Sequence, residues 1–500
     1  MNVKRDYAGG MGVADPSLRS THGHDPGYIT LPYMSLLYTA AVVEEAGHEV
    51  VFVDAQADGL GIPEVVARVR EAGAEVLVSV LNLPSLYGDI EVLKGIKQAI
   101  SGIRTVALGT VCIPLFDEIA ASGAADAVIQ GDPEPGILDV LEVFSGKSAI
   151  PDGAACVSKP GDSGTLTRSA PAEEGKGSAR VKTLERQHGV LTNRTPFRIT
   201  DLDALPRLPY HLVPIEKYWY HGFGEGVRYA AVFASRGCSF KCYYCPYPVG
   251  FGDRIVHRDP IKVVDEIEDL HRQHGVKGIL FRDQVFTMDW DKTHRLCDEI
   301  IRRNLGLQWV VETRLDRVNA DLLRKMKQAG CVRVHYGLES GDPRLFSRVG
   351  KDGAEDRMEA LVQNFIATEQ AGIHPHMFIL IGLVGETRNT IERTISVIQR
   401  IKPLTLQVAV VTPYPGTPLY DEVREKGLLL TQDWAQYTGF RAVARTEALS
   451  AEDLEKARRR ILSAHRSAIP WKRRRYLARL AGRYLRDGSL WRRVMRRVSG

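Results

Sequence analysis

The 500-residue sequence contains no long uninterrupted hydrophobic run. A membrane-spanning helix needs about 20 apolar residues in succession, and no window of the sequence approaches that length. The N-terminal sequence MNVKRDYAGGMG also lacks the apolar core of a secretory signal. These two absences predict a cytoplasmic protein with no membrane span.

Cysteine is scarce, with 7 residues in the whole chain. A set of thiols that is both sparse and odd in number argues against a disulfide framework. Three of them nevertheless lie close together in the sequence, at Cys238, Cys242 and Cys245. This clustering points to a bound metal.

The composition is that of an ordinary soluble globular chain, 44% hydrophobic and 25% charged, which excludes disorder and fibrous structure. The net charge of +5 is unevenly distributed, because residues 451–500 carry +12 and residues 1–450 carry −7. The basicity therefore belongs to the tail and argues against nucleic-acid binding as the function of the whole chain.

The first 145 residues alternate between helical and extended hydrophobic patterns. Helices are expected at residues 34–47 and 62–72, and strands at residues 49–55, 75–81, 105–109 and 124–129. Apolar strands joined by helical crossovers predict a doubly wound parallel sheet covered on both faces. Only residues 1–3 stand where the first strand is expected, so either that strand is truncated or the true gene begins upstream.

Residues 146–205 are rich in Gly, Ser, Pro and charge, which predicts a linker that contains one hairpin. Six further strand and helix pairs then follow over residues 206–440. This pattern predicts a closed or partial α/β barrel, the second domain of an α/β protein, with its sites at the carboxyl ends of the strands. Residues 441–500 are expected to form a basic helical tail.

The strongest motif is SRGCSFKCYYCPYP, which places three cysteines in a C-x3-C-x2-C pattern directly after the first barrel strand. Three thiolates on one loop can bind three irons of a 4Fe-4S cluster and leave the fourth iron open, whereas a closed zinc site needs four ligands. Zinc completed by a distant histidine remains the alternative. The other cysteines, at positions 112, 156, 297 and 331, are expected to be small buried hydrophobic residues.

The cysteine triplet at the start of a six-strand barrel resembles the radical S-adenosylmethionine (SAM) superfamily. In that family the open iron binds the amino and carboxylate groups of SAM, and reductive cleavage yields a 5′-deoxyadenosyl radical. The resemblance implies a 4Fe-4S cluster and SAM as cofactors, a small-molecule substrate, and a reducing partner of the flavodoxin or ferredoxin type.

The resemblance also assigns cofactor contacts to individual residues. Tyr244 would present its backbone to the adenine, Asp283 would accept from the amino group of SAM, and Arg314 would bind the carboxylate of SAM. Glu339 resembles the ribose-contacting residue, and Gly382 opens IGLVGET, which resembles the motif that closes the fifth strand. For the three charged residues, an ordinary polar role at a strand end is the alternative.

Strand alternation predicts that Arg333, His335 and Glu339 share one face of the fourth barrel strand. His374 and His376 likewise share a face of the fifth. If Glu339 points into the barrel, the barrel interior is polar, and these histidines either contact substrate or have satisfied structural roles.

The N-terminal pattern resembles the cobalamin-binding domain of one radical SAM class, so that the resemblance spans residues 1–440. It implies that residues 54–59, 81–87 and 109–113 contact the corrin. Two departures stand out. There is no Asp-x-His-x-x-Gly segment for a lower axial histidine, and GDPEPG replaces the usual Gly-Glu-Gly-Glu.

The expected function is cobalamin-dependent methylation of an unactivated carbon in a secondary metabolite, with S-adenosylhomocysteine and 5′-deoxyadenosine as coproducts. The first alternative is a cobalamin-independent radical dehydratase or rearrangement enzyme acting on a sugar or aminoglycoside-like substrate. The second is an RNA-modifying or non-catalytic protein that uses the basic tail. The simpler interpretation of the tail is a helix that packs on the barrel and exposes its basic face to solvent.

Two weaker motifs predict no site. His22 and His24 lack acidic or thiol neighbours that would complete a metal site. GFGEGV, at residues 222–227, precedes a strand and does not lead from a strand into a helix, so it fails the context that a phosphate-binding loop requires.

Overall fold

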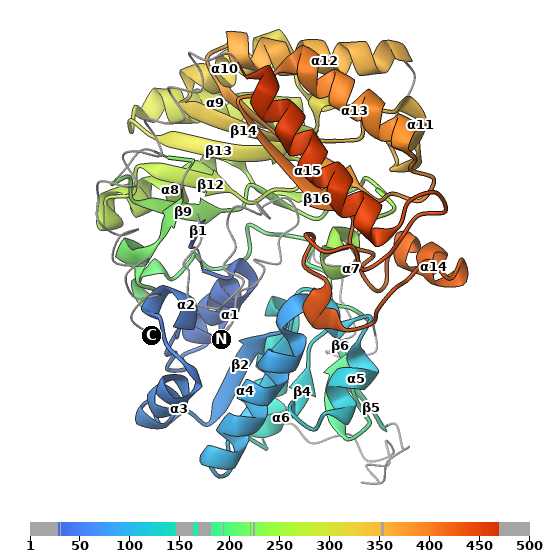
Figure 1. Cartoon of the computed structure of the whole chain (residues 1–500). Coiled ribbons are helices and arrows are strands. Elements are labelled where there is room, and N and C mark those ends of the chain that lie inside the picture. The colour runs from blue at the N-terminus through green and yellow to red at the C-terminus, as the bar shows by residue number, and fades with distance from the viewer. Residues whose placement is uncertain are drawn as a thin grey trace, which may run out of the picture.

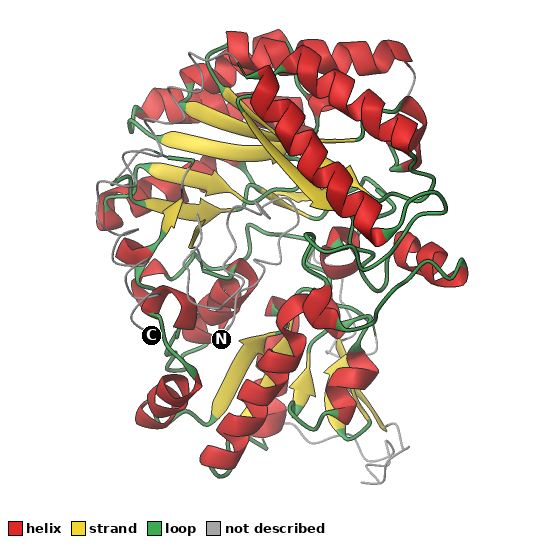
Figure 2. Ribbon diagram, in the orientation of Figure 1, coloured by secondary structure: helices red, strands yellow, loops and turns green. Residues whose placement is uncertain are grey.

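The computed structural model describes residues 29–30, 32–146, 164–168, 182–193, 195–220, 222–223, 226–351 and 355–469. Its two large sheets each have six strands and their own helices (Figures 1 and 2). The expectations for residues 1–3, His22, His24, Cys156, most of the tail after residue 469 and part of GFGEGV lie outside the described residues.

The first sheet belongs to the N-terminal part of the chain. Its strands lie in the order β2 (Val76–Val80), β3 (Arg104–Leu108), β4 (Ala127–Val128), β7 (Val190–Asn193), β6 (Lys182–Gln187) and β5 (Gly164–Arg168). The first four strands are parallel and the last two are antiparallel.

Helices cover both faces of this sheet. One face packs on α1 (Met34–Glu45) and α6 (Glu134–Phe144), and the other on α3 (Ile62–Glu71), α4 (Leu86–Ala99) and α5 (Phe116–Ala121). The prediction of a doubly wound α/β domain is therefore confirmed.

Residues 49–55 were expected to form a strand, and this prediction was wrong. The segment is irregular, Val51 is 57% exposed, and the short helix α2 (Ala55–Asp58) begins at its end. A strand requires a hydrogen-bonded neighbour. In the described sheet β2 is an edge strand, and a cavity of about 440 Å³ lies between β2 and residues 48–53.

The expected linker also differs from the structure, because β5, β6 and β7 lie within it and extend the first sheet. β7 pairs with β4, and the turn between β6 and β7 has positive φ angles at His188 and Gly189. The average composition of the segment concealed a few apolar residues, such as Leu184 and Leu191, that the sheet buries.

The second sheet is entirely parallel. Its order is β9 (Tyr229–Val232), β12 (Gly278–Phe281), β13 (Gln308–Thr313), β14 (Cys331–Glu339), β15 (His374–Ile381) and β16 (Thr405–Val410). β9 and β16 occupy opposite edges of the sheet and do not pair with each other. Of the closed and the partial barrel that were expected, the structure is therefore the partial one.

Helices follow the barrel strands in the expected alternation. They are α8 (Pro260–His274), α9 (Trp290–Arg303), α10 (Ala320–Gln328), α12 (Glu355–Gln370), α13 (Arg388–Ile401) and α15 (Ala451–Ala468). In Figure 1, α10, α12 and α13 lie on the side of the sheet that faces away from the N-terminal domain. α15 packs on the barrel through Leu454 and Ile461, both fully buried.

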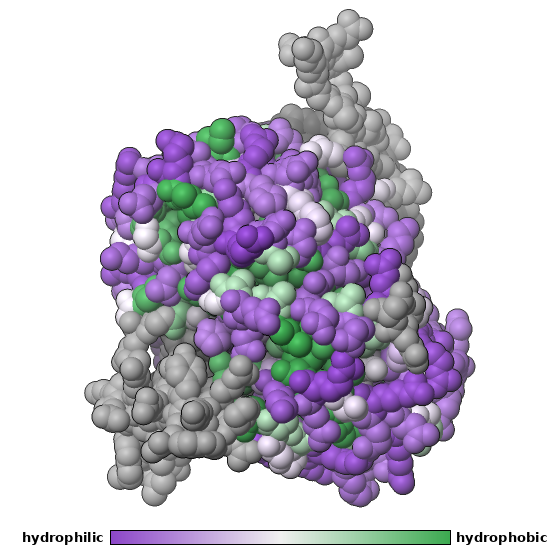
Figure 3. Space-filling model, turned by 90° about the horizontal axis from the view of Figure 1, so that it is seen from above, coloured by the Kyte–Doolittle hydropathy of each residue, from purple (hydrophilic) through white to green (hydrophobic). Residues whose placement is uncertain are grey.

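The face of the molecule shown in Figure 3 is mainly hydrophilic, with hydrophobic side chains in small groups. Among the helices within the described residues, none has both the length and the hydrophobicity needed to cross a bilayer.

Candidate active site

The three clustered cysteines lie on one loop, residues 237–252, which we call the cysteine loop. Its neighbours are β10 (Ser235–Arg236), β11 (Val256–His257) and, within the loop, the short helix α7 (Tyr247–Phe251). Gly237 has a φ of 86°, and a Cβ there would collide with the carbonyl oxygen of Arg254. Since the loop follows β9, the thiols lie at the carboxyl ends of the barrel strands, where catalytic residues of such barrels gather.

Burial of the three thiols favours their protonated form. Burial raises the pKa of all three thiols, and the Cys242 thiolate further raises the pKa values of Cys238 and Cys245. A bound metal reverses this effect, because it favours the thiolate. The donor set therefore suits a metal centre.

The cysteine motif favours a cluster over a single ion. A closed zinc site needs four ligands, whereas an iron–sulfur cluster distributes its cysteines over separate irons. Within the described residues, no three His, Cys, Asp or Glu side chains are placed to hold a metal ion, the trio included. The C-x3-C-x2-C motif, and not the distances between the thiols, therefore indicates a 4Fe-4S cluster.

Two cations flank the trio. Lys351 and Arg314 both lower the pKa of Cys242, against the larger effect of burial. Arg314 donates to Asp316 at 2.9 and 2.7 Å, and its guanidinium carbon lies 3.9 Å from the centre of the Phe240 ring. Its remaining terminal nitrogen, Nη1, is buried without a hydrogen-bond partner. This nitrogen could receive a carboxylate beside the thiols.

Glu339 and Tyr244, predicted separately as cofactor contacts, are joined to each other. The Tyr244 phenol donates to Oε1 of Glu339 at 2.8 Å, and Lys351 Nζ lies 3.0 Å from the same oxygen. Glu339 has a φ of 64°, unusual for a residue with a side chain, and the register between β14 and β15 shifts beside it. The bulge turns this carboxylate toward the cysteine loop.

Asp283 lies at the end of the second barrel strand, as expected, but its carboxylate is engaged by the chain before the cysteine loop. It accepts from the Ala234 amide at 3.0 Å and from the Ser235 hydroxyl at 2.5 Å. Asp283 is 1% exposed, and burial raises its pKa to about 6. In this arrangement it anchors the entry to the loop.

Gly382 begins the turn after the fifth barrel strand. It has a φ of 90°, and its amide donates to the Glu386 carboxylate four residues later. Glu386 is 1% exposed, and burial raises its pKa to about 8. The buried Glu386 carboxylate therefore stabilises the turn that follows the fifth barrel strand.

The two predicted histidine positions on the barrel interior are close together. The ring centres of His335 and His376 are 5.0 Å apart. Nε2 of His335 lies 3.0 Å from the Tyr220 hydroxyl, and Nδ1 of His376 lies 2.9 Å from the Thr405 hydroxyl. His374, in contrast, is exposed at the start of its strand.

The cysteine loop also meets the N-terminal domain. Pro246, Tyr247 and Phe251 line a cavity of about 60 Å³ together with residues 81–84 and 110–111, from two of the three segments expected on a corrin. The third segment lies elsewhere, where Asp54 accepts from the Tyr218 hydroxyl at 3.1 Å. The apolar lining suits a macrocycle, but ligand pockets usually measure about 300–1,000 Å³, so the loops would have to part.

Residues 232–398 match the family model described as the radical SAM superfamily. The chain carries a radical SAM domain. The matched segment includes the predicted residues Cys238, Cys242, Tyr244, Cys245, Asp283, Arg314, Glu339 and Gly382.

Three relatives extend the comparison. The chain is 26% identical to an uncharacterized methyltransferase of Pyrococcus horikoshii, over 86% of this chain and 87% of the relative. It is 25% identical to the anaerobic magnesium-protoporphyrin IX monomethyl ester cyclase of Cereibacter sphaeroides, over 90% and 71%. It is also 25% identical to the cytidylyl-2-hydroxyethylphosphonate methyltransferase of Streptomyces wedmorensis, over 72% and 70%.

Solved structures share the fold. The radical SAM methyltransferase TsrM from Kitasatospora setae, with cobalamin and a [4Fe-4S] cluster bound, superposes with a TM-score of 0.63 at 16% identity, covering 89% of this chain and 88% of that one. The cobalamin-dependent SAM radical enzyme OxsB gives 0.66 at 12% identity, covering 86% and 64%. At these identities the solved structures show a shared fold, and the family match places a radical SAM domain within it.

Several charged residues that the structure buries were not predicted from the sequence. Lys351 lies outside any motif, and Glu386 lies within IGLVGET, where only Gly382 was singled out. Arg236 lies within SRGCSFKCYYCPYP, and Asp132 and Glu134 lie within GDPEPG, so these motifs were the available signals.

Proposed function

We propose that this enzyme binds a 4Fe-4S cluster through Cys238, Cys242 and Cys245 and uses SAM to methylate an unactivated carbon of a small secondary metabolite with the aid of cobalamin. The observation that carries the proposal is the thiol trio, of which Cys238 is buried and Cys242 and Cys245 are half-buried, with the unpaired Nη1 of Arg314 beside it. The relatedness to methyltransferases supports it. In this proposal the N-terminal domain, extended by β5 to β7, binds cobalamin, and residues 206–440 form the catalytic barrel.

The bound groups would supply one-electron reduction, a carbon-centred oxidant and a transferable methyl group. The chain supplies positions and charges. Arg314 would pair with the SAM carboxylate and Glu339 with its ribose hydroxyls, while the Tyr244 phenol and Lys351 hold the Glu339 carboxylate in place. Gly382 would allow close approach of the cofactor to the turn after the fifth strand. Tyr244 would present its backbone to the adenine.

Asp283 has a separate role in this arrangement. Its hydrogen bonds to Ala234 and Ser235 fix the start of the cysteine loop, and the amino group of SAM would be its remaining partner. His335 and His376, on the barrel interior, would orient the substrate through their imidazole nitrogens. Electrons would come from a flavodoxin- or ferredoxin-type donor.

One observation favours a second candidate. The cavity of about 60 Å³ between the domains is far smaller than a corrin, and the altered GDPEPG segment lies in the same domain. A cobalamin-independent dehydration or rearrangement of a sugar-like or aminoglycoside-like substrate would need no larger space there.

Anaerobic reconstitution separates these functions. The protein is incubated with iron, sulfide and hydroxocobalamin, desalted, and reacted with SAM and dithionite, while bound iron, corrin and nucleoside products are measured. We expect about four irons per chain, bound corrin, and both 5′-deoxyadenosine and S-adenosylhomocysteine. Deoxyadenosine without corrin or homocysteine product would select the second candidate, and a protein that binds no iron would contradict both.

A matched pair of substitutions controls for misfolding. Cys245→Ala removes a member of the trio, whereas Cys297→Ala removes a buried thiol of α9 outside the cysteine loop. We expect the first variant to lose iron and deoxyadenosine formation and the second to retain both. Equal iron binding by the two variants would contradict the proposed ligands.

A further inference from the structure

Arg236 lies two residues before Cys238 and forms an ion pair with the N-terminal domain. We propose that Arg236 is a positioning residue, which fixes the cysteine loop against that domain through Asp132 and Glu134. This inference rests on the proposed function, because it concerns the loop that would hold the cluster.

The contact is short and almost completely desolvated. Nη1 of Arg236 lies 3.2 Å from Oδ1 of Asp132, and Nη2 lies 2.9 Å from Oε1 of Glu134. The exposed fractions of the three residues are only 2 to 3%. Asp132 lies between β4 and α6, and Glu134 begins α6, so the ion pair joins the N-terminal domain to β10, the short strand that leads into the cysteine loop.

The attraction between these charges does not by itself make the contact a net stabiliser of the interface. Removing an arginine and two carboxylates from water costs most of the Coulomb energy that their pairing returns, and apolar residues would stabilise the interface as well. Buried ion pairs contribute instead to a single geometry, because any displacement leaves a charge unpaired. Here that geometry is the position of the strand that leads into Cys238.

Aromatic rings narrow the position of the guanidinium further. Its central carbon lies 5.3 Å from the ring centre of Tyr38 on α1, 5.4 Å from that of Phe233 and 5.9 Å from that of Phe251. Tyr38 belongs to the N-terminal domain, and Phe251 closes α7 within the cysteine loop. The arginine is therefore surrounded by elements from both sides of the interface.

The C-terminal part of the cysteine loop is also held by contacts with residues outside the loop. Arg198 donates to the carbonyl oxygens of Val249 and Gly250, both at 3.0 Å. A Cβ at Gly250 would collide with the Thr110 side chain. Thr110 lies in residues 109–113, which are proposed to contact cobalamin, so that segment and the cysteine loop are in close contact.

A substitution in the N-terminal domain should therefore alter the metal centre in the barrel. The test compares reconstituted wild type, Glu134→Gln and Arg236→Lys with Arg303→Lys, a control in an ion-pair network on the outer helices. Glu134→Gln keeps a hydrogen-bond acceptor of the same shape, and Arg236→Lys keeps the charge but loses the two-pronged geometry. For each we measure iron content, the electron paramagnetic resonance spectrum of the reduced cluster with and without SAM, and deoxyadenosine formation.

We expect Glu134→Gln and Arg236→Lys to retain iron, to shift the spectrum obtained with SAM, and to form deoxyadenosine about tenfold more slowly. Arg303→Lys should match the wild type. If Arg236 only stabilised its own strand, substitution of Glu134 would leave the spectrum of the reduced cluster unchanged. Unchanged spectra and rates in both variants would overturn the inference.

Two further results separate the positioning role from misfolding and from loss of the cluster. If either variant fails to fold, the triple variant Arg236→Met, Glu134→Leu and Asp132→Asn removes all three charges and keeps the acceptor for the Ile199 amide. A folded triple variant with a wild-type spectrum would overturn the inference, and one with a shifted spectrum would support it. A wild-type protein that binds no cluster would instead contradict the proposed function, whereas a normal wild type with unaffected variants contradicts only the positioning role.

Discussion

Lys351 and Glu339 form a buried ion pair beside the thiol trio, with Nζ of the lysine 3.0 Å from Oε1 of the glutamate. The same ammonium group donates to the Gly337 carbonyl oxygen at 2.7 Å. The lysine thus holds the bulge that carries Glu339, the residue proposed to contact the ribose of SAM.

Lys351→Met should destabilise the fold by about 3 kcal/mol, because it leaves the Glu339 carboxylate buried without its cation. Adding Glu339→Gln removes the unpaired charge and should recover most of the loss. Denaturant unfolding of the two variants and the wild type checks this. If the double variant were as unstable as the single one, the ion pair would not be the source of the effect.

Arg314→Lys should weaken SAM binding about tenfold while leaving iron content unchanged, since a lysine cannot reproduce the fork that pairs with both Asp316 and a carboxylate. Arg317→Lys is the matched control, because Arg317 lies over the same Phe240 ring at 5.2 Å. Equilibrium binding of SAM to the reconstituted proteins measures both. Equal losses in the two variants would argue against a specific role for Arg314.

Asp283 should make stability depend on pH. Its pKa rises from 3.8 to about 6 on folding, with burial as the largest cause, so its contribution is fully present below pH 3.8 and is lost as pH rises through about 6. Between pH 5 and 7.5 this loss amounts to about 1 kcal/mol. The difference in unfolding free energy between wild type and Asp283→Asn should follow this course, and a difference independent of pH would contradict the assignment.

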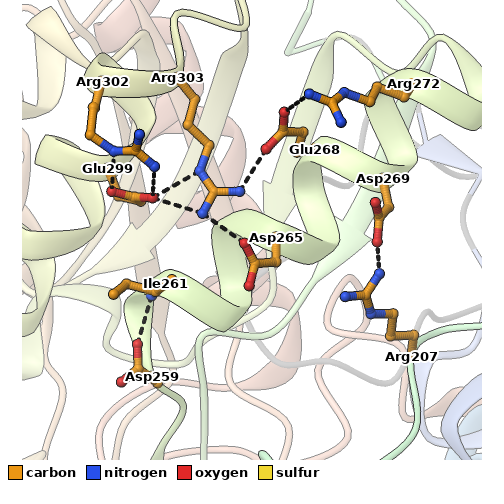
Figure 4. A network of polar contacts seen from close by, with 10 residues as sticks. All are labelled: Arg207, Asp259, Ile261, Asp265, Glu268, Asp269, Arg272, Glu299, Arg302 and Arg303. Atoms are coloured by element: carbon orange, nitrogen blue, oxygen red, sulfur yellow. Dashed lines mark hydrogen bonds and ion pairs between the residues drawn. The ribbon is translucent and has the colours of Figure 1, made fainter.

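The network between α8 and α9 should contribute to stability and not to catalysis (Figure 4). Arg303 contacts Asp265, Glu268 and Glu299, and its side chain is 10% exposed. Arg303→Met should therefore cost about 1 to 2 kcal/mol, with the rate of SAM cleavage unchanged.

Arg302→Met is the control for this network. Arg302 pairs with Glu299 alone, and its side chain is 68% exposed, so we expect a much smaller effect on thermal unfolding. Equal effects of the two substitutions would show that the shared contact to Glu299 dominates, contrary to this expectation.

Local patterns were sufficient for most of the fold. The six strand and helix pairs expected over residues 206–440 became the six strands of the barrel and the helices that follow them. Residues 49–55 had an equally apolar pattern but form no strand, since strand formation depends on a neighbouring chain segment and not on the pattern alone.

The sequence by itself determined the cysteine loop, because its three thiols lie within eight residues and a turn brings them together whatever surrounds it. It also determined the order of strands and helices that carries the loop to the end of a barrel. Tertiary structure decided which charges meet there: Lys351 and Glu339 are 12 residues apart, and Arg236 and Glu134 are 102 apart. Such pairs form only when folding removes both partners from water, and no local pattern records that burial.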